Sequence, residues 1–324
     1  MQAAWYEKQG PPGESLVVGE MAEPTPGAGE LRIRIAASGV NPGDVKKRQD
    51  TFGVGMPYPR VVPHSDGAGT VDQVGDGVDA QWVGKRVWCF GAQSYRPFGT
   101  AAELCVVPES QVSELPADAS FEQGALLGIP GLTAHRAIHA GGPVDGRTVL
   151  VQGGAGAVGT YAVRLARLAG ATVIATVQKA GQSDTAKEAG AHHVVQSGER
   201  LLEEVTALAP DGVDHIVEVA FAANIGIDER MLKLGGSIAA YASNAPEATI
   251  PFWPLVFKNV RVFFLGSDDF PIEAKRQAAH DLSAAIEHAW VGLPIGARFG
   301  LADIADAHAY IEERRGPGRV IVVL

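Results

Sequence analysis

The chain has 324 residues, of which 46% are hydrophobic and 20% are charged. This balance is typical of a folded protein, and the length suits two domains of about 100–200 residues each. A formal net charge of −10 without a long block of like charge argues against a nucleic-acid or anionic-membrane surface. The first residues lack an apolar signal core, and no stretch reaches the ~20 apolar residues of a membrane helix. We therefore expect a cytoplasmic protein without nucleic-acid or membrane partners.

Residues 1 to about 120 contain short apolar segments separated by glycine and proline. In the segment 30–40, polar and apolar residues alternate, so Leu31, Ile33 and Ile35 share one face of a predicted strand. Similar segments follow at 67–75, 84–91 and 99–108. This spacing predicts a small antiparallel barrel or sandwich.

Two cysteines, Cys89 and Cys105, fall in these predicted strands. We interpret them as small buried hydrophobic residues. Two scattered thiols also exclude a structural zinc lobe built from four cysteines.

The second half of the chain has a different pattern. Residues 120–140 predict a helix with a break at Pro130–Gly131, and from Thr148 onward strands alternate with helices. The segment 227–236 is predicted to be one of these helices, ending at Gly236. The apolar segment 259–266 closes the series. Such alternation predicts a parallel sheet with helices on both faces. The tail adds helices and a strand at 319–324 that is expected to return to the first domain.

A glycine cluster follows the first strand of this series. Gly154, Gly156 and Gly159 fit G-x-G-x-x-G, come directly after the apolar strand at 148–152, and open a helix. In that context the glycines allow a tight turn, close approach of a pyrophosphate, and close packing of helix against strand. The pattern predicts a dinucleotide site at the helix N-terminus.

The end of the next strand bears on which nucleotide binds. An NAD site usually has a carboxylate there for the ribose 2′-hydroxyl. This chain has Thr176, Val177, Gln178 and Lys179 instead, and Lys179 can pair with a 2′-phosphate. The sequence favours NADPH, while an ordinary solvated lysine remains the alternative for Lys179.

These residues resemble the medium-chain dehydrogenase/reductases, specifically the zinc-free quinone oxidoreductase (zeta-crystallin) branch. The similar segments are "GVNPGDVKKR" (39–48), "HSDGAGTVDQVGDGV" (64–78), "GIPGLTAHRAI" (128–138), the glycine turn and "GPGRVIVVL" (316–324). The resemblance implies an α/β chain with a GroES-like β-barrel catalytic domain (1–122 and 272–324) and a doubly wound Rossmann nucleotide domain (123–271), separated by a cleft. It also implies an NADPH-dependent homodimer that reduces quinones or activated alkenes.

The zinc-dependent relatives offer an internal comparison. They carry a cysteine in the segment that reads "GVNPGD" here, and a histidine where this chain has Ser65. His64 is one position off and has no cysteine nearby. We therefore expect no metal, and without a Lewis acid the reduction of an electrophilic acceptor is favoured over alcohol oxidation.

The family motifs and the strand ends together supply the candidate residues. The catalytic candidates are Asn41, Asp44, Lys46 (where many relatives have tyrosine) and Thr133. The cofactor candidates are Gly154, Gly156, Ala157, Val158, Gly159, Thr176, Gln178, Lys179, Ala220, Tyr241, Leu265, Ser267 and Arg319. The aromatic candidates for a substrate pocket are Phe52, Tyr58, Tyr95, Phe98 and Trp253.

Three functions stay open at this point. The first is an NADPH-dependent quinone reductase, and the second is an NADPH-dependent enone or alkenal reductase, which also needs a proton donor. The third is a non-catalytic NADPH-binding protein. The apolar segment 259–266, if it forms the outermost strand of the nucleotide sheet, predicts a homodimer, because an exposed apolar edge invites pairing.

Overall fold

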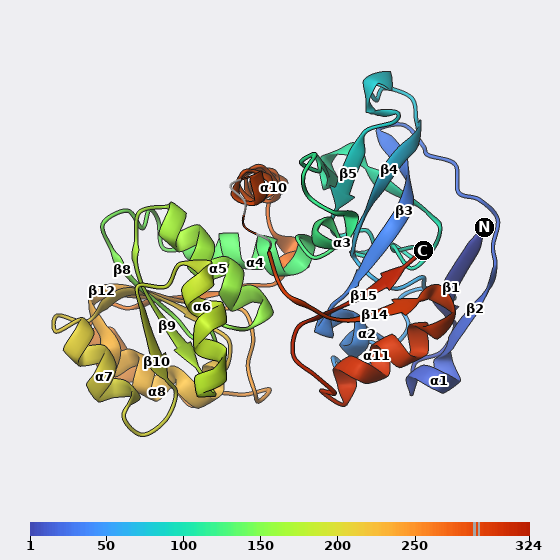
Figure 1. Ribbon diagram of the computed structural model, residues 1–324. Coiled ribbons are helices and arrows are strands. Elements are labelled where there is room, and N and C mark those ends of the chain that lie inside the picture. Colours follow the sequence, from blue (N-terminus) through green and yellow to red (C-terminus); the bar gives the residue numbers. More distant parts are fainter. Residues whose placement is uncertain (288–289, 291) are drawn as a thin grey trace. The chain divides into compact units, whose positions relative to one another are not determined.

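The computed structural model describes residues 1–287, 290 and 292–324. The chain forms two compact units (Figure 1): unit 1 comprises residues 1–129 and 271–324, and unit 2 comprises residues 130–270. This division places residues 123–129 with unit 1, whereas the sequence placed them with the nucleotide domain. The short helix α3 (Phe121–Gly124) contacts β3, β4 and β5 of unit 1, which explains why the chain around it belongs there.

Unit 1 contains most of the short strands predicted for the first part of the chain. Its strands are β1 (Gln2–Tyr6), β2 (Leu16–Glu20), β3 (Glu30–Val40), β4 (Asp66–Val74), β5 (Arg86–Cys89), β6 (Leu104–Pro108), β7 (Val112–Glu114), β14 (Ile295–Gly300) and β15 (Arg319–Val323). Its other helices are α1 (Pro12–Ser15), α2 (Pro42–Arg48), α10 (Ile272–Glu287) and α11 (Ile304–Glu312).

The long strand β3 organises the larger sheet of unit 1. The sheet has the order β14-β15-β3-β4-β5-β7, and β6 pairs with the first half of β3 while β15 pairs with its second half. Leu31, Ile33 and Ile35 are buried on one face of β3, as the alternation predicted. The C-terminal strand β15 pairs antiparallel with β3, so the tail does return to this unit.

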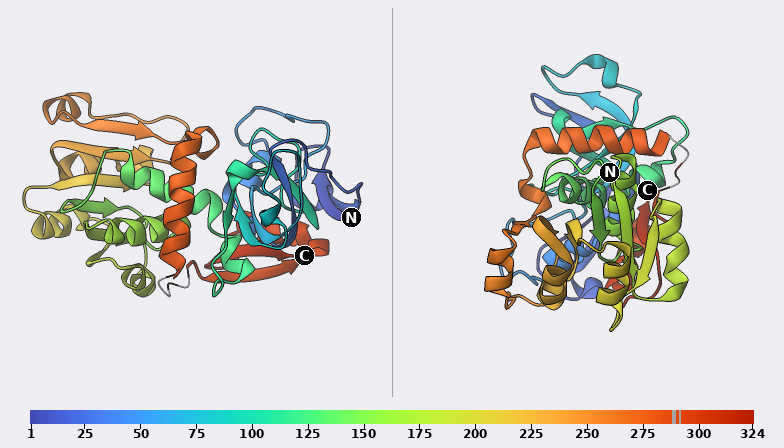
Figure 2. Two further views of the ribbon diagram at one scale, coloured as in Figure 1. Left: turned by 90° about the horizontal axis from the view of Figure 1, so that it is seen from above. Right: turned by 90° about the vertical axis from the view of Figure 1, so that its left-hand side faces the viewer.

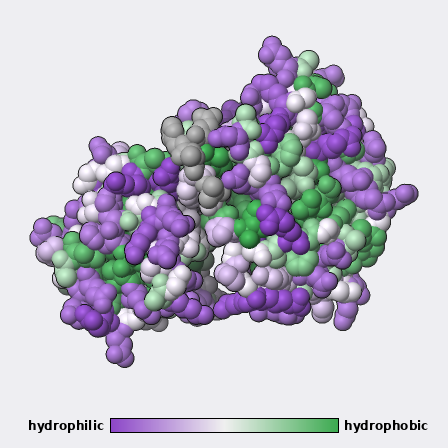
Figure 3. Space-filling view, viewed as in Figure 1, coloured by the Kyte–Doolittle hydropathy of each residue, from purple (hydrophilic) through white to green (hydrophobic). Residues whose placement is uncertain are grey.

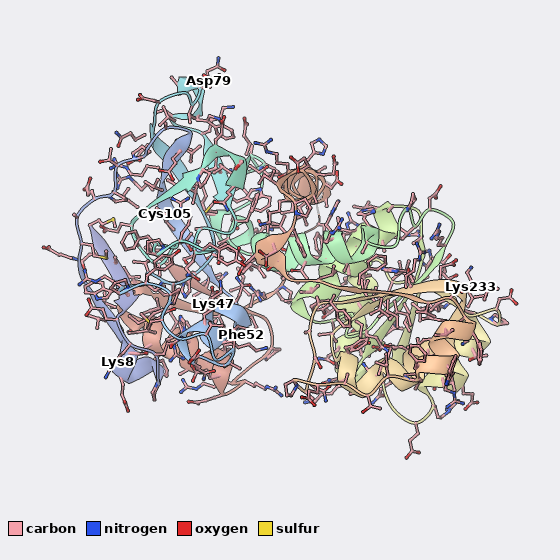
Figure 4. All side chains as sticks on the ribbon, turned by 180° about the vertical axis from the view of Figure 1, so that it is seen from behind. Lys8, Lys47, Phe52, Asp79, Cys105 and Lys233 are labelled. Atoms are coloured by element: carbon pink, nitrogen blue, oxygen red, sulfur yellow. The ribbon has the colours of Figure 1, made fainter. Side chains whose placement is uncertain are left out.

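Both cysteines lie in the interior of unit 1, and Figure 4 labels Cys105 there. Burial raises the pKa of the Cys105 thiol to about 12 and raises that of Cys89 as well. Cys89 and Cys105 pack with the apolar residues of β3 and β4. Their interpretation as small buried hydrophobic residues is confirmed.

Unit 2 contains the alternating strands and helices. Its strands are β8 (Thr148–Val151), β9 (Thr172–Val177), β10 (His193–Gln196), β11 (Val213–Glu218), β12 (Leu232–Ala240) and β13 (Arg261–Phe264). Its helices are α4 (Gly128–His139, whose first two residues belong to unit 1), α5 (Ala157–Leu168), α6 (Ser183–Ala189), α7 (Leu201–Leu208), α8 (Phe221–Met231) and α9 (Phe252–Phe257).

The strands of unit 2 form one parallel sheet in the order β10-β9-β8-β11-β12-β13. This is the order of a doubly wound dinucleotide-binding sheet. Helices α5 and α6 contact each other on one face, and α7 and α8 contact each other on the opposite face (Figures 1 and 2). The predicted fold class of a parallel sheet with helices on both faces is confirmed, and β13 is its edge strand.

Two predicted details of unit 2 are wrong. The break in the helix predicted over 120–140 lies at 125–127, between α3 and α4, and not at Pro130. Helix α4 runs through Pro130, because proline in the first helical turn removes no intrahelical hydrogen bond. Helix α8 ends at Met231 rather than Gly236, and Leu232 already begins β12. Pairing with β11, supported by an ion pair between Lys233 and Asp214, overrides the local helix preference of this segment.

The surface shown in Figure 3 is largely hydrophilic, with apolar groups between the polar side chains. In the part of the chain that the structure describes, no helix is both long and apolar enough to cross a bilayer.

A buried chain of hydrogen bonds connects five segments of unit 1. Arg48 Nε donates to His308 Nδ1 at 3.3 Å, and the two imidazoles of His308 and His64 meet at 3.0 Å between their Nε2 atoms. His64 Nδ1 lies 2.8 Å from Ser38 Oγ. Ser38 Oγ lies 2.7 Å from Thr100 Oγ1, which donates to the backbone carbonyl of residue 66 at 2.7 Å.

The two ends of this chain determine where its protons lie. A guanidinium only donates and a carbonyl only accepts, so every group between them must accept from one neighbour and donate to the next. Both imidazoles are therefore neutral and hold a single tautomer. Burial lowers the pKa of His64 to about 3, and burial together with His64 and Arg48 lowers the pKa of His308 well below its ordinary value.

We expect His308→Gln to reduce the acid sensitivity of folding. The unfolded chain protonates this histidine below pH 6.5 and the folded chain does not, so the imidazole costs stability as the pH falls through that value. Glutamine can still accept from Arg48 and donate to His64, but it does not titrate. Between pH 6.5 and 5, the slope of unfolding free energy against pH should be shallower by up to about 1.4 kcal/mol per pH unit.

Urea unfolding at several pH values measures this slope. His280→Gln serves as the control, because His280 is exposed on α10 and lies outside the buried chain of hydrogen bonds. An unchanged slope in His308→Gln would contradict the assignment of a neutral imidazole.

Candidate functional site

The glycine turn lies between the end of β8 and the start of α5. The N–H of Gly154 donates to the carbonyl of Thr176 at the end of β9, which joins the turn to the neighbouring strand. A Cβ at Gly159 would lie 2.1 Å from the carbonyl oxygen of Gly153, and one at Gly154 would lie 2.7 Å from the Cβ of Ala175. A Cβ at Gly156 would meet only the Gly153 carbonyl oxygen, at 3.2 Å. The first and third glycines are therefore required by packing, and the second lies where the turn is open.

The N-terminus of α5 presents the groups that bind an anion. Gly156 is the N-cap, and no acidic side chain occupies the first turn. The N–H groups of Ala157, Val158 and Gly159 belong to this turn and have no helical acceptor. Together with the positive end of the helix dipole they can hold a phosphate. These residues fit the pyrophosphate of a dinucleotide.

The end of β9 separates the predicted nucleotide residues into two groups. Thr176 is buried, and its hydroxyl accepts from the N–H of Gly153 and donates to Gln152 Oε1. Thr176 thus faces the interior below the glycine turn. Gln178 and Lys179 are exposed beyond the strand, where Gln182 Oε1 accepts from both of their backbone N–H groups at 3.1 Å.

A cavity of about 600 Å³ opens at the carboxyl ends of β12 and β13. Tyr241 and Leu265 line it, and Ala220 and Ser267 directly adjoin its lining residues. The structure therefore brings Tyr241 and Leu265 together at the edge of the sheet where open α/β folds bind ligands.

In unit 1, Asn41 lies at the centre of a buried polar group. Arg319 Nη2 donates to Asn41 Oδ1 at 2.5 Å, and Asn41 Nδ2 donates to Asp66 Oδ2 at 2.7 Å. The backbone N–H of Ile129 donates to the same Asp66 oxygen at 2.8 Å. Arg319, one of the cofactor candidates from the sequence, is thus held beside Asn41.

Asp66 was missed by the sequence analysis, although its motif "HSDGAG" had been singled out. Its carboxyl group is fully buried, and within the described residues Oδ1 has no hydrogen-bond partner. Burial, and next the charge of Asp44, raise the pKa of Asp66 to about 7, against the opposing effects of Asn41, Ile129 and Arg319. Near neutral pH this carboxyl group can therefore either hold or release a proton.

The remaining catalytic candidates have separate positions. Asp44 is buried on α2, and its carboxylate accepts from the backbone N–H of Asn41 at 2.7 Å, which stabilises the start of that helix. Lys46 is exposed on the same helix. Thr133 is buried in α4.

The aromatic pocket candidates are mostly exposed. In unit 1, Tyr58 donates to the carbonyl of Tyr95. Phe52, labelled in Figure 4, follows α2 and is 57% exposed. Phe98 is 46% exposed and pairs through a single bridge with Val62. Trp253 lies on α9 of unit 2 and is 62% exposed.

In the described part of the chain, no group of three or more histidine, cysteine or acidic residues is placed so that it could hold a metal ion. Ser65, at the position where the resemblance expects the zinc-ligand histidine, and the adjacent His64 are both buried. His64 uses both ring nitrogens for the hydrogen-bonded chain of unit 1.

Comparisons with known proteins agree with this architecture. The family model described as the alcohol dehydrogenase GroES-like domain matches residues 27–117, and the model described as zinc-binding dehydrogenase matches residues 157–281. The quinone oxidoreductase of Rattus norvegicus is 32% identical, over 94% of this chain and 92% of that protein.

Solved structures give the same result. A mycobacterial quinone oxidoreductase superposes with a TM-score of 0.88 at 30% identity, with full coverage of both chains. A mycobacterial protein complexed with NADPH has a TM-score of 0.84 at 30% identity, again with full coverage of both chains. Unit 1 thus corresponds to a GroES-like domain and unit 2 to a Rossmann domain. Like these relatives, the chain belongs to the medium-chain dehydrogenase/reductase superfamily, in its quinone oxidoreductase branch.

Proposed function

We propose that the chain is an NADPH-dependent reductase that transfers a hydride to a quinone without a metal ion. One observation carries the cofactor part of this proposal. The glycine turn opens on the N-terminus of α5, and the neighbouring strand β9 ends in exposed Gln178 and Lys179 without a carboxylate. The N-terminus of α5 can bind a pyrophosphate, and Lys179 can pair with a 2′-phosphate.

The proposal of a quinone acceptor and a metal-free reaction has two supports. The relatives at about 30% identity include several named quinone oxidoreductases. The segments "GVNPGD" and "HSDGAG" lack the cysteine and the histidine that zinc-dependent members carry. NADPH would supply the hydride, and a quinone accepts it without the alkoxide stabilisation that zinc provides.

In this proposal unit 2 binds the cofactor through Ala157, Val158, Gly159 and the cavity at β12 and β13. Asn41 remains the catalytic candidate of unit 1. Because Asn41 is held between the guanidinium of Arg319 and the carboxyl group of Asp66, its amide has one fixed orientation. A fixed polar group is what polarisation of an acceptor requires.

A reductase of activated alkenes is the second candidate. It needs a proton donor for the enolate, and Tyr241 lines the cavity of unit 2. Burial and the nearby Glu218 raise the pKa of Tyr241, so the phenol keeps its proton at neutral pH. A protein that binds NADPH without catalysis is the third candidate.

Assays with NADPH and either an ortho-quinone or an α,β-enone separate these candidates. We expect faster oxidation of NADPH with the quinone, and unchanged activity after dialysis against a metal chelator. Preference for the enone would support the second candidate, and tight NADPH binding without turnover would support the third. Loss of activity on dialysis, with recovery on adding zinc, would refute the metal-free reaction.

We further propose a cytoplasmic homodimer that forms at the edge strand β13. Phe264 on this strand is 72% exposed, and Trp253 and Phe257 on the adjacent segment are 62% and 73% exposed. The two rings of α9 stack with centroids 5.8 Å apart. A second copy paired along β13 would cover both the unpaired edge and these aromatic residues.

Phe264→Glu should convert the dimer to a monomer, because it places charge on the surface that pairs. Light scattering should give a mass near 67.6 kDa (2 × 33.8 kDa) for the wild type and near 33.8 kDa for the variant. Leu234→Glu is the matched control, since Leu234 is equally exposed, at 71%, but lies elsewhere in unit 2. A monomeric wild type at micromolar concentration would refute the dimer.

Gly156→Asp should abolish binding of both NADPH and NADH. The aspartate adds bulk and negative charge at the open side of the turn, where a phosphate approaches. Gly226→Asp on α8 is the control, because a Cβ there meets no atom within 4 Å. Fluorescence titration measures both affinities, and retained binding in Gly156→Asp would exclude the turn as the phosphate site.

Lys179→Ala should weaken NADPH about tenfold to a hundredfold and leave NADH nearly unchanged, as expected for the loss of ~1–3 kcal/mol from one charge-assisted contact. Added salt should reduce the difference, because the contact is exposed. Lys187→Ala, an exposed lysine on α6, is the control. Equal wild-type affinity for the two cofactors would contradict the assignment of NADPH.

A further inference from the structure

A second buried polar chain lies directly beneath the glycine turn in unit 2. The N–H of Gly153 donates to Thr176 Oγ1 at 3.0 Å, and this hydroxyl donates to Gln152 Oε1 at 2.8 Å. Gln152 Nε2 then donates to Asp228 Oδ1 at 2.9 Å. The side chains of Gln152, Thr176 and Asp228 are 2%, 1% and 0% exposed. The hydrogen bonds therefore run in one direction, from the turn to a carboxyl group on α8.

The chain continues to a second carboxyl group. Glu218, the last residue of β11, accepts from Asn224 Nδ2, one helical turn before Asp228 on α8. The carboxyl groups of Asp228 and Glu218 interact, and both are fully buried. Among the described residues, Asp228 Oδ2 has no donor. Two buried carboxylates in contact repel each other strongly, whereas one proton between them satisfies both. Burial and Glu218 raise the pKa of Asp228 well above its ordinary value, in agreement with this arrangement.

Glu218 connects the chain to the other cofactor-binding loop. Its Oε1 accepts from the backbone N–H of Ala220, the residue predicted to adjoin the cofactor. It also accepts from Asn224 Nδ2 at 3.1 Å. Four linked side chains thus extend from the turn after β8 to the loop after β11, and both loops lie at the carboxyl edge of the sheet.

We propose that Asp228 and Glu218 share one proton and that this pair, through Gln152 and Thr176, positions both loops for the dinucleotide. This inference rests on the proposed function only in that unit 2 binds a dinucleotide. Thr176 is then a positioning residue and not a contact to the 2′-phosphate. Its effect must be the same for NADPH and NADH, because the glycine turn serves the pyrophosphate that both contain.

The test measures the affinity of the full-length protein for NADPH and NADH in two variants. Thr176→Val keeps the shape of the side chain and removes both of its hydrogen bonds. Asp228→Leu removes the shared proton and leaves Glu218 without its partner. We expect each to weaken both cofactors by a similar factor, about tenfold or more. A loss confined to NADPH in Thr176→Val, or unchanged affinity for both cofactors in either folded variant, would overturn the proposal.

Rescue by a conservative variant distinguishes the shared proton from packing. In Asp228→Asn, the amide oxygen still accepts from Gln152 and the amide nitrogen donates to Glu218, as the proton did. This variant should bind both cofactors within about threefold of the wild type. Loss of binding in Asp228→Asn as severe as in Asp228→Leu would contradict a protonated Asp228.

Folding stability gives an independent measurement on the same variant. The folded protein retains a proton on Asp228 that the unfolded chain releases above pH 3.8, so this group makes the wild type less stable as the pH rises. The titratable groups that bear on the pair are Glu218 itself and Tyr241, which lies beside it. Asp228→Asn should therefore gain stability relative to the wild type between pH 5 and 8, and a constant difference would refute the shared proton.

Asp214→Asn is the matched control. Asp214 lies on the same strand as Glu218, but it pairs with Lys233 and accepts from the N–H of Thr148 at the opposite end of the sheet. Its substitution should lower stability and leave both affinities unchanged. If the wild type binds neither cofactor, the proposed function itself fails. If the wild type binds both cofactors and Thr176→Val and Asp228→Leu bind them equally well, only the role of the polar chain fails.

Discussion

The nucleotide-binding unit depends on one close backbone contact, between the first turn of α5 and the end of β8. A Cβ at Gly159 would lie 2.1 Å from the carbonyl oxygen of Gly153, so a larger residue would push the helix away from the strand. This contact determines where the free N–H groups of the helix point, and with them the position of a bound phosphate. The strand order β10-β9-β8-β11 then places the neighbouring loops around that position.

Buried polar groups support the candidate sites in both units, and in both the ends of a hydrogen-bonded chain fix its protons. In unit 1 the chain begins at the donor Arg48 and ends at a backbone carbonyl, so the two histidines between them are neutral. In unit 2 it begins at the N–H of Gly153 and leads to two carboxyl groups, of which one must be protonated. At the surface, water would compete for each of these hydrogen bonds. Because the bonds are buried, each group must donate to or accept from its protein neighbour.

The group formed by Asn41, Asp66 and Arg319 follows a different principle. Here a guanidinium and a carboxyl group are separated by an amide that bonds to both. The amide is thereby fixed in orientation. Asp66 titrates near pH 7, so the net charge of this group changes within the neutral range. Asn41 is one of the four catalytic candidates that the family resemblance supplied, and its neighbours give a physical reason for its precise placement.

The sequence alone predicted what depends on neighbours along the chain. Alternation predicted the buried face of β3, and alternating strands and helices predicted the parallel sheet. The spacing of Gly154, Gly156 and Gly159 after an apolar strand predicted the turn, because strand, turn and helix are consecutive. The lack of a carboxylate near Lys179 could also be read directly. Local patterns placed two details wrongly, the break at Pro130 and the end of α8, because helix position and strand pairing outweigh local preference.

Only the tertiary structure identified the partners of the buried polar residues. Asn41 and Arg319 are 278 positions apart, and Arg48 and His308 are 260 positions apart, so no spacing along the chain connects them. The same holds for Thr176, which the sequence placed toward the ligand and which the structure turns toward Gln152. An isolated polar residue in a sequence fits a surface, a site or a core equally well. Its function depends on which groups folding brings within hydrogen-bonding distance in a dry interior, and that is a property of the assembled fold.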